Sequence, residues 1–222
     1  LWMLLSLASP VLALVHFLAT PDPPLVCCWT LTMLALWHAR DGGWRWWLLA
    51  GLTAGLALVA KYSGAFLAVG GLVLLLFDAR MRAQLRRPAP YVAVLVAAAV
   101  FSPVVIWNAN RGFESFRFQT EGRFSKGTLG TRWLFEFVSE QFGVVHPVLA
   151  VGCVGAVLWL ARRCHRDPRA LWLLAFGLPL PLYMLTQSLW IQVKLNWLAP
   201  ALVPLTLGVV LWWREHLVTR LR

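Results

Sequence analysis

The stretch PYVAVLVAAAVFSPVVIW, residues 90–107, runs for eighteen positions without a charged side chain. A helix needs ~20 predominantly apolar residues to cross the hydrocarbon core of a bilayer. Other apolar segments lie on both sides, and some reach that length only if flanking Trp, Tyr and Arg side chains extend to the interface. They cover about residues 1–18, 24–38, 46–60, 63–77, 147–161, 170–187 and 197–213. We therefore predict an all-α polytopic membrane protein with about eight transmembrane helices in a single domain, 1–222.

The overall composition supports a membrane protein and excludes a nucleic-acid-binding domain. Hydrophobic residues make up 60% of the chain, against about 45–50% in soluble domains. The 14 tryptophans suit a protein with many bilayer interfaces. The net charge of +11 is compatible with a nucleic-acid partner, but the basic residues lie in short loops between apolar segments. We therefore expect the lipid bilayer as a partner and no nucleic acid.

The cysteines and the start of the chain give weaker information. The four cysteines form no CxxC pair and no Cys/His spacing, so neither a disulfide framework nor a zinc site is predicted. We assign no cofactor and no metal ligand, while a divalent metal stays open. The chain begins inside an apolar run without a Met or a signal pattern. We expect it to be a fragment that lacks N-terminal sequence.

Basic residues are concentrated in every second connection between the apolar segments. The connections 39–45, 78–89 and 162–169 and the tail from 214 hold 13 of the 20 Lys and Arg residues and 4 of the 9 acidic residues. The alternate connections hold 7 basic and 5 acidic residues. By the positive-inside rule, the basic connections are predicted to be cytoplasmic. Asp22, Lys61, the segment 108–146 and Lys194 then all lie on the outer face.

Residues 108–146 form the longest stretch outside the predicted membrane helices. Its second half, TRWLFEFVSEQFGVV (131–145), favours a helix lying in the membrane interface. Long loops without a function are uncommon in compact domains. We therefore interpret 108–146 as an outer-face, substrate-binding element.

Two polar positions interrupt the apolar segments near their ends. Asp22 lies in LATPDPPL (18–25), and it is either a helix N-cap before two prolines or a functional acid at an outer cavity. Lys61 and Tyr62 lie in LVAKYSGAFL (58–67), and they are either interfacial anchors or ligands for a phosphate. Lys61 is also a candidate partner for Asp22.

Two further groups complete the candidate site. Arg111, Arg117 and Arg123 are spaced six apart among phenylalanines, and their guanidinium forks suit phosphate oxygens. The alternative is an interfacial loop whose Phe side chains enter lipid. The stretch QVKLNWLAP (192–200) contributes Lys194, Asn196 and Trp197 as substrate-binding candidates, or as a cap and anchor of the last helix.

Four stretches taken together resemble one family. They are ATPDPPLVCCWTLTMLALWHA (19–39), WRWWLLAGLTAGLALVAKYSGAFL (44–67), FSPVVIWNANRGFESFRFQ (101–119) and VKLNWLAP (193–200). In this order they are similar to the bacterial membrane glycosyltransferases of family 39, relatives of the protein O-mannosyltransferases and of the aminoarabinose transferase that acts on lipid A. The resemblance implies a GT-C transmembrane bundle with an extracytoplasmic active site in the bacterial inner membrane.

The resemblance also implies a reaction and residue roles. A polyprenyl-phosphate-linked sugar is the donor, the acceptor is lipid A, another glycan, a lipid or a protein, and transfer inverts the anomeric carbon. Asp22 matches an acid near the catalytic cavity, and Lys61 matches a lysine near the carrier phosphate. The loop that closes over donor and acceptor contains the three arginines, and Tyr62 and Asn108 join the candidate substrate contacts. The family's Asp-Glu motif of the first outer loop, which carries its expected general base, is not in this sequence.

Two other functions remain open from the sequence. A transporter or flippase of lipid-linked envelope intermediates is the alternative, although transporters place ionisable groups near the bilayer midplane and often contain repeats. A structural subunit of an envelope assembly is the third hypothesis, under which Asp22 and Lys61 are replaceable.

Overall fold

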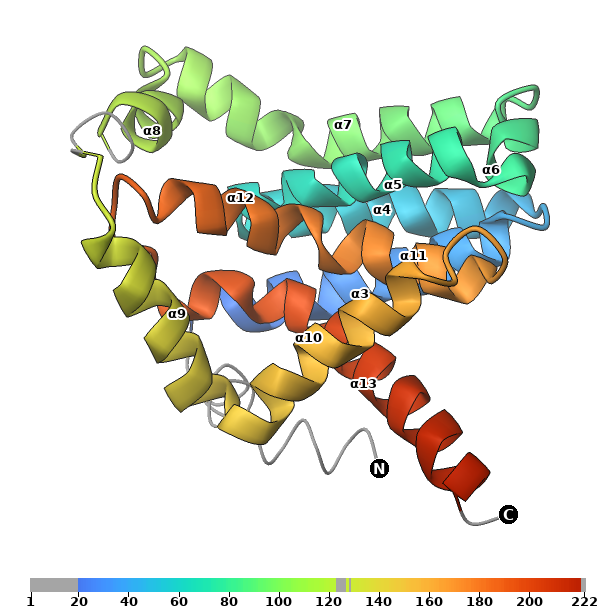
Figure 1. Cartoon of the computed structure of the whole chain (residues 1–222). Coiled ribbons are helices and arrows are strands. Elements are labelled where there is room, and N and C mark those ends of the chain that lie inside the picture. Colours follow the sequence, from blue (N-terminus) through green and yellow to red (C-terminus); the bar gives the residue numbers. More distant parts are fainter. Residues whose placement is uncertain (1–19, 123–126, 128, 221–222) are drawn as a thin grey trace.

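The computed structural model describes residues 20–122, 127 and 129–220, and within them the chain is helical and contains no strand (Figure 1). The longer helices are α3 (Asp22–Ala39), α4 (Trp44–Ala60), α5 (Phe66–Phe77), α7 (Ala89–Ala109), α9 (Arg132–Val145), α10 (Pro147–Ala161), α11 (Pro168–Gly177), α12 (Pro179–Gln187) and α13 (Ala199–Arg220). The short elements between them are η1 (Tyr62–Ala65), α6 (Ala79–Gln84), α8 (Glu114–Arg117), η2 (Phe118–Gly122) and η3 (Leu195–Leu198). The prediction of an all-α membrane protein is confirmed.

The predicted apolar segments correspond to helices wherever the structure describes them. Segment 1–18 lies outside the described residues. Segment 63–77 starts with the 3₁₀ turn η1 before α5 begins. Segment 170–187 is divided into α11 and α12 at Leu178, because Pro179 and Pro181 have no N–H to continue the helical ladder. The interfacial stretch 131–145 is α9, and the short helices α6 and α8 were not predicted.

Three helical stretches in the described part are long and apolar enough to cross a membrane. They are Ala89–Ala109, Pro168–Gln187 and Leu195–His216. A fourth candidate consists of Arg132–Gly143 and Pro147–Ala161, which meet at an angle of 107°. The helices Trp44–Ala60 and Tyr62–Phe77 are apolar but shorter. These stretches make the chain a multi-pass membrane protein.

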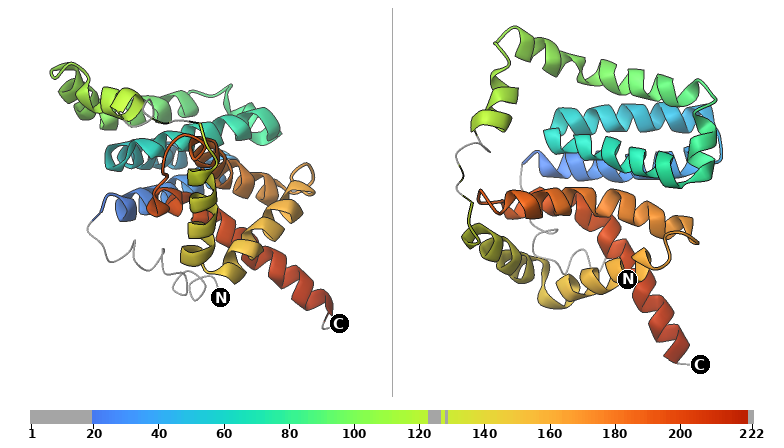
Figure 2. Two further views of the ribbon diagram at one scale, coloured as in Figure 1. Left: turned by 60° about the vertical axis from the view of Figure 1, so that its left-hand side comes forward. Right: turned by 45° about the horizontal axis from the view of Figure 1, so that its top comes forward.

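Helices α3, α4, α5 and α7 run side by side with the α11–α12 pair, and α10 and α13 cross this layer (Figures 1 and 2). Helix α4 packs between α3 and α7. Its Gly51 and Gly55 both face α7. A Cβ on Gly55 would lie 2.9 Å from the Ala97 carbonyl oxygen, and one on Gly51 would overlap the Ala93 carbonyl. Small residues four apart therefore allow these two helices to approach closely, as in many membrane bundles.

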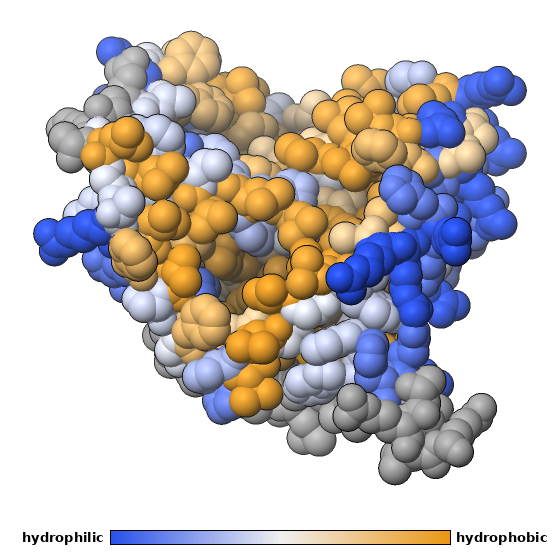
Figure 3. All heavy atoms as spheres, in the orientation of Figure 1, coloured by the Kyte–Doolittle hydropathy of each residue, from blue (hydrophilic) through white to orange (hydrophobic). Residues whose placement is uncertain are grey.

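Apolar side chains fill the interior and also cover part of the exterior. Trp29, Leu74 and Phe176 are fully buried where α3, α4, α5 and α11 meet. On the outside, Leu76 is 66% exposed and Val94 is 68% exposed. Figure 3 shows apolar side chains spread over one face of the molecule, with the hydrophilic ones gathered mainly along one side. A large apolar exterior is expected for helices whose solvent is lipid.

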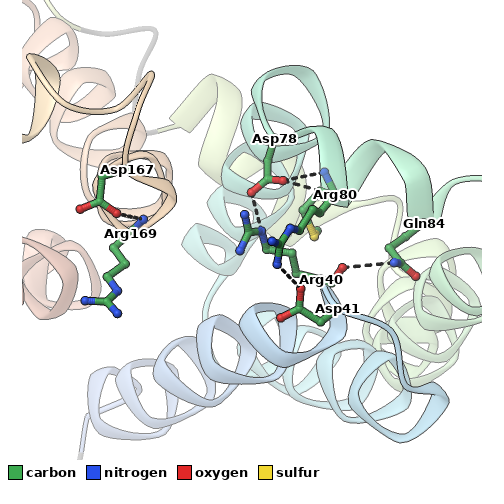
Figure 4. A network of polar contacts seen from close by, with 8 residues as sticks. Arg40, Asp41, Asp78, Arg80, Gln84, Asp167 and Arg169 are labelled. Atoms are coloured by element: carbon green, nitrogen blue, oxygen red, sulfur yellow. Dashed lines mark hydrogen bonds and ion pairs between the residues drawn. The ribbon is translucent and has the colours of Figure 1, made fainter.

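A polar network holds the basic end of the bundle (Figure 4). Arg40, just after α3, donates from Nε to Asp78 Oδ2 at 2.6 Å, and both side chains are nearly buried. Asp78 also caps α6 by accepting hydrogen bonds from the backbone N–H groups of Arg80 and Met81. Gln84 donates to the Arg40 carbonyl oxygen. The network therefore ties the α3–α4 loop to the α5–α6 connection.

Candidate functional site

The opposite end of the bundle brings together four segments that are distant in the sequence. They are the start of α3, the α4–η1 turn, the end of α7 with α8, and the α12–η3–α13 connection. This end is on the left-hand side of Figure 1. Most of the residues predicted for the site are carried by these segments.

Asp22 is the first residue of α3, and its carboxylate is buried. Pro21 occupies the N-cap position and no side chain caps the helix, so the N-cap interpretation of Asp22 is wrong. The reason is that the carboxylate has other partners. Its Oδ1 accepts a hydrogen bond from Lys61 Nζ at 2.6 Å, and its Oδ2 accepts one from Asn196 Nδ2 at 2.6 Å. The prolines at the helix start thus fix a carboxylate that faces the bundle, with only 1% of the residue exposed.

Lys61 reaches Asp22 because α4 ends abruptly in front of it. Its backbone is extended, with φ −162° and ψ 140°, and η1 starts at the next residue. The chain then folds back against α4, so that a Cβ on Gly64 would lie 2.7 Å from the Ala57 carbonyl oxygen. Only glycine fits this close approach without a shift. The Lys61 side chain is 21% exposed, whereas that of Asp22 is 1% exposed.

Asn196 is held by a second short turn. Lys194 is extended, η3 covers the next four residues, and α13 starts at Ala199. Trp197 in the same turn is 8% exposed and packs with Phe137 and Leu180. This packing anchors η3 to α9 and α12, and it directs the Asn196 amide to the start of α3.

A cavity of about 350 Å³ opens beside this cluster. Its lining is Lys61, Tyr62, Ser63, Phe66, Gln119, Thr120, Tyr183, Met184 and Trp197. Lys61, Tyr62 and Trp197 were predicted as site residues. Ser63 and Phe66 follow the Lys-Tyr pair directly, so their proximity to it was the available signal. Tyr183 and Met184 gave no signal, because they lie within an apolar segment.

Tyr62, Asn108 and Ser115 form a hydrogen-bonded group next to the cavity. The Tyr62 hydroxyl group and Ser115 Oγ are within hydrogen-bonding distance. Asn108 is completely buried, and its Nδ2 donates to the Val104 carbonyl oxygen at 2.9 Å and to the Tyr62 hydroxyl at 3.4 Å. Its Oδ1 accepts from the Ser115 backbone N–H at 3.2 Å. The Asn108 amide is therefore occupied by contacts within the protein.

The other predicted cations that the structure describes, Arg111, Arg117 and Lys194, are not among the residues that line the cavity. The Arg111 guanidinium lies over the Trp107 ring, 4.8 Å from its centroid. Arg117 is exposed on α8, and Lys194 is exposed before η3. Arg123 lies outside the described residues.

No metal cluster is found in the described ranges. No group of three or more His, Cys, Asp or Glu side chains is placed to hold an ion there. The chemistry that these ranges offer at the cavity is a lysine ammonium held by a buried carboxylate, together with hydroxyl, amide and aromatic groups.

Two comparisons relate the chain to known proteins. Residues 1–107 match the family model described as dolichyl-phosphate-mannose-protein mannosyltransferase. The chain is also similar to the lipid A galacturonosyltransferase RgtD of Rhizobium johnstonii, with 32% identity over 167 residues. That alignment covers 73% of the chain and 34% of RgtD, so the chain spans about a third of the length of this relative. No solved structure matches the chain.

The family match contains part of the cluster described above. The family match includes α3, α4 and the turn that carry Asp22 and Lys61. These similarities agree with the helical membrane fold. Together, these comparisons support a GT-C membrane glycosyltransferase related to the protein mannosyltransferases.

Proposed function

We propose that this chain forms part of a glycosyltransferase that moves a sugar from a polyprenyl-phosphate donor to an extracytoplasmic acceptor, with inversion at the anomeric carbon. One observation carries the proposal: the buried Asp22–Lys61 pair lies beside a cavity at the end of the bundle opposite the basic network. The similarity to GT-C glycosyltransferases supports the reaction class, and the name of RgtD makes lipid A the first acceptor to assay.

The charges suit the departure of a phosphate. Breaking the bond between the sugar and the carrier phosphate builds negative charge on the phosphate oxygens, and a fixed cation stabilises that charge. Lys61 lines the cavity and supplies the cation. Asp22 holds the ammonium group at 2.6 Å and thereby directs it, while Asn196 holds the second carboxylate oxygen.

This arrangement also assigns Asp22 a definite task. Both of its carboxylate oxygens already accept hydrogen bonds, and the residue is 1% exposed. We therefore propose that Asp22 orients Lys61 and that another carboxylate takes the proton of the acceptor hydroxyl. A general base must come within hydrogen-bonding reach of the proton that it removes.

The sidedness of the site follows from the charge pattern. The basic connections and the Arg40–Asp78 network lie at one end of the bundle, and the cavity lies at the other. With the basic end in the cytoplasm, the cavity opens on the outer side of the inner membrane. The ionisable residues of the site are at helix ends, an arrangement that favours a transferase over a transporter with a midplane site.

Turnover of a polyprenyl-phosphate sugar by the whole protein tests the proposal. Asp22→Asn and Lys61→Ala should each lower kcat/KM by about 100-fold or more, as expected when a group that stabilises developing charge is lost. Asp41→Asn and Arg80→Ala are matched controls, because they remove an exposed ion pair at the basic end. Full activity in both site variants would overturn the assignment.

A further inference from the structure

The outer segment that follows α7 is fastened to the cavity wall by three side chains. This segment, Phe113–Thr120, contains α8 and the start of η2, and its Gln119 and Thr120 line the cavity together with Lys61, Tyr62 and Ser63. We propose that Asn108 and Ser115 are positioning residues that, by binding Tyr62, hold the segment Phe113–Thr120 in place at the cavity. We call this position, in which Gln119 and Thr120 line the cavity, the seated position. The inference rests on the proposed function, and it gives Asn108 and Tyr62 a different task from direct substrate binding.

Asn108 binds three separate parts of the chain with one amide. It joins its own helix through the Val104 carbonyl, the α4–η1 turn through Tyr62, and the outer segment through the Ser115 N–H. The Asn108 backbone carbonyl also accepts hydrogen bonds from the N–H groups of Arg111 and Phe113, at 3.0 and 2.8 Å. One buried residue thus fixes both the turn after α7 and the position of α8.

Tyr62 contacts the segment with both its hydroxyl group and its ring. Its hydroxyl group pairs with Ser115 Oγ, and its ring lies 5.2 Å from the ring of Phe116, centroid to centroid. Phe101 of α7 also packs against Tyr62, in an edge-to-face arrangement with a centroid distance of 6.3 Å. The hydroxyl of Tyr62 therefore acts on the outer segment, while its neighbour Lys61 acts at the cavity.

The backbone at the start of the segment is strained. Phe113 has φ 61° and ψ 30°, a left-handed conformation that is unfavourable for a bulky residue. Such strain persists only where surrounding contacts hold it. Weakening the contacts to Tyr62 should therefore increase the population of unseated segments, in which Gln119 and Thr120 no longer line the cavity.

This model predicts a specific kinetic signature. If only a fraction of the protein has the segment seated, the apparent affinity falls by that fraction, and saturating donor restores the seated state. Loss of one side-chain hydrogen bond changes the equilibrium constant between the seated and unseated positions about 5-fold. Ser115→Ala should raise KM for the donor by up to about 5-fold and change kcat less than about 2-fold. Tyr62→Phe should raise KM at least as much, because the Tyr62 hydroxyl also accepts a hydrogen bond from Asn108. The double variant should match Tyr62→Phe, because Ser115→Ala removes only a bond that Tyr62→Phe already removes.

A second measurement does not depend on turnover. Amide hydrogen exchange of residues 113–120 in the whole protein should accelerate about 5-fold in both variants, because local opening becomes easier. Ser139→Ala and Tyr91→Phe are matched controls that remove hydroxyl groups bonded to backbone carbonyls away from the cavity. They should leave exchange of this segment unchanged.

Unchanged exchange in Ser115→Ala would overturn the inference. So would a fall of kcat in Tyr62→Phe with a silent Ser115→Ala, since that result means direct action of the hydroxyl on substrate. A fall of kcat with unchanged KM and a lower melting temperature in both variants would indicate a merely structural role, and it would also overturn the inference. If the wild-type protein turns over no polyprenyl-phosphate sugar, the proposed function fails, and the exchange experiment still decides whether the segment is seated in this way.

Discussion

The Asp22–Lys61 pair makes an asymmetric prediction about stability. Removing one member of a buried ion pair leaves the other charge uncompensated, which costs roughly 3–5 kcal/mol in a fully buried site. The Asp22 side chain is 1% exposed and that of Lys61 is 21% exposed. Because the Lys61 side chain is the more exposed of the two, Asp22→Asn should lower the free energy of unfolding by about 2 kcal/mol. Lys61→Met leaves a buried carboxylate without its partner and should lower the free energy of unfolding by about 4 kcal/mol.

The double variant Asp22→Asn/Lys61→Met tests whether the cost of each single substitution comes from the charge that is left unpaired. It leaves no buried charge at the site, and replacing a buried ion pair by neutral groups of similar size is often close to neutral. It should therefore unfold within about 1 kcal/mol of the wild type and still be inactive, because the cation at the cavity is gone.

Unfolding of the detergent-solubilised protein, followed by the helical circular dichroism signal, measures these differences. The same cycle at Arg80–Asp41, whose side chains are 64% and 60% exposed, serves as the reference and should show less than about 1 kcal/mol throughout. The reasoning is refuted if the double variant at the site is destabilised by the sum of the single variants. It is also refuted if Asp22→Asn costs more than Lys61→Met.

Two further predictions concern packing and orientation. Gly51→Ala should lower the melting temperature by several degrees, because the added Cβ overlaps the Ala93 carbonyl. The control Gly71→Ala on α5 meets nothing within 4 Å, so it should leave the melting temperature unchanged or raise it. Equal melting temperatures of the two variants would contradict the close α4–α7 contact. In a variant without the four native cysteines, Asn110→Cys should react with a membrane-impermeant maleimide in intact spheroplasts. Arg82→Cys should react with it only after the cells are lysed. The reverse pattern would contradict the proposed orientation.

Local patterns in the sequence were sufficient for the helices but not for their ends. Apolar runs such as 90–107 become helices because a lipid-exposed backbone must satisfy its own hydrogen bonds. The N-cap interpretation of Asp22 failed because it considered only neighbouring residues. A carboxylate at a helix start usually accepts backbone N–H groups, but here a lysine and an amide from other segments bind it.

The candidate site was also only partly predictable from the sequence. Asp22, Lys61 and Asn196 were each recognisable as polar residues at the ends of apolar segments. Their meeting was not predictable from spacing, because Asn196 follows Asp22 by 174 positions and the contact depends on how α13 packs against α3. Asn108 was expected among the candidate substrate contacts, and the structure buries it as a link between α7, α8 and Tyr62.

The sequence by itself determined the membrane location, the helical segments and the charge difference between the two ends of the bundle, because each of these depends on local composition. Only the tertiary structure decided which polar groups share a site. A buried charge needs a partner in space rather than in sequence, and the packing of α3, α4 and η3 provides Lys61 and Asn196 as the partners of Asp22. The same packing leaves the Lys61 ammonium at the cavity wall, where we propose that the carrier phosphate binds.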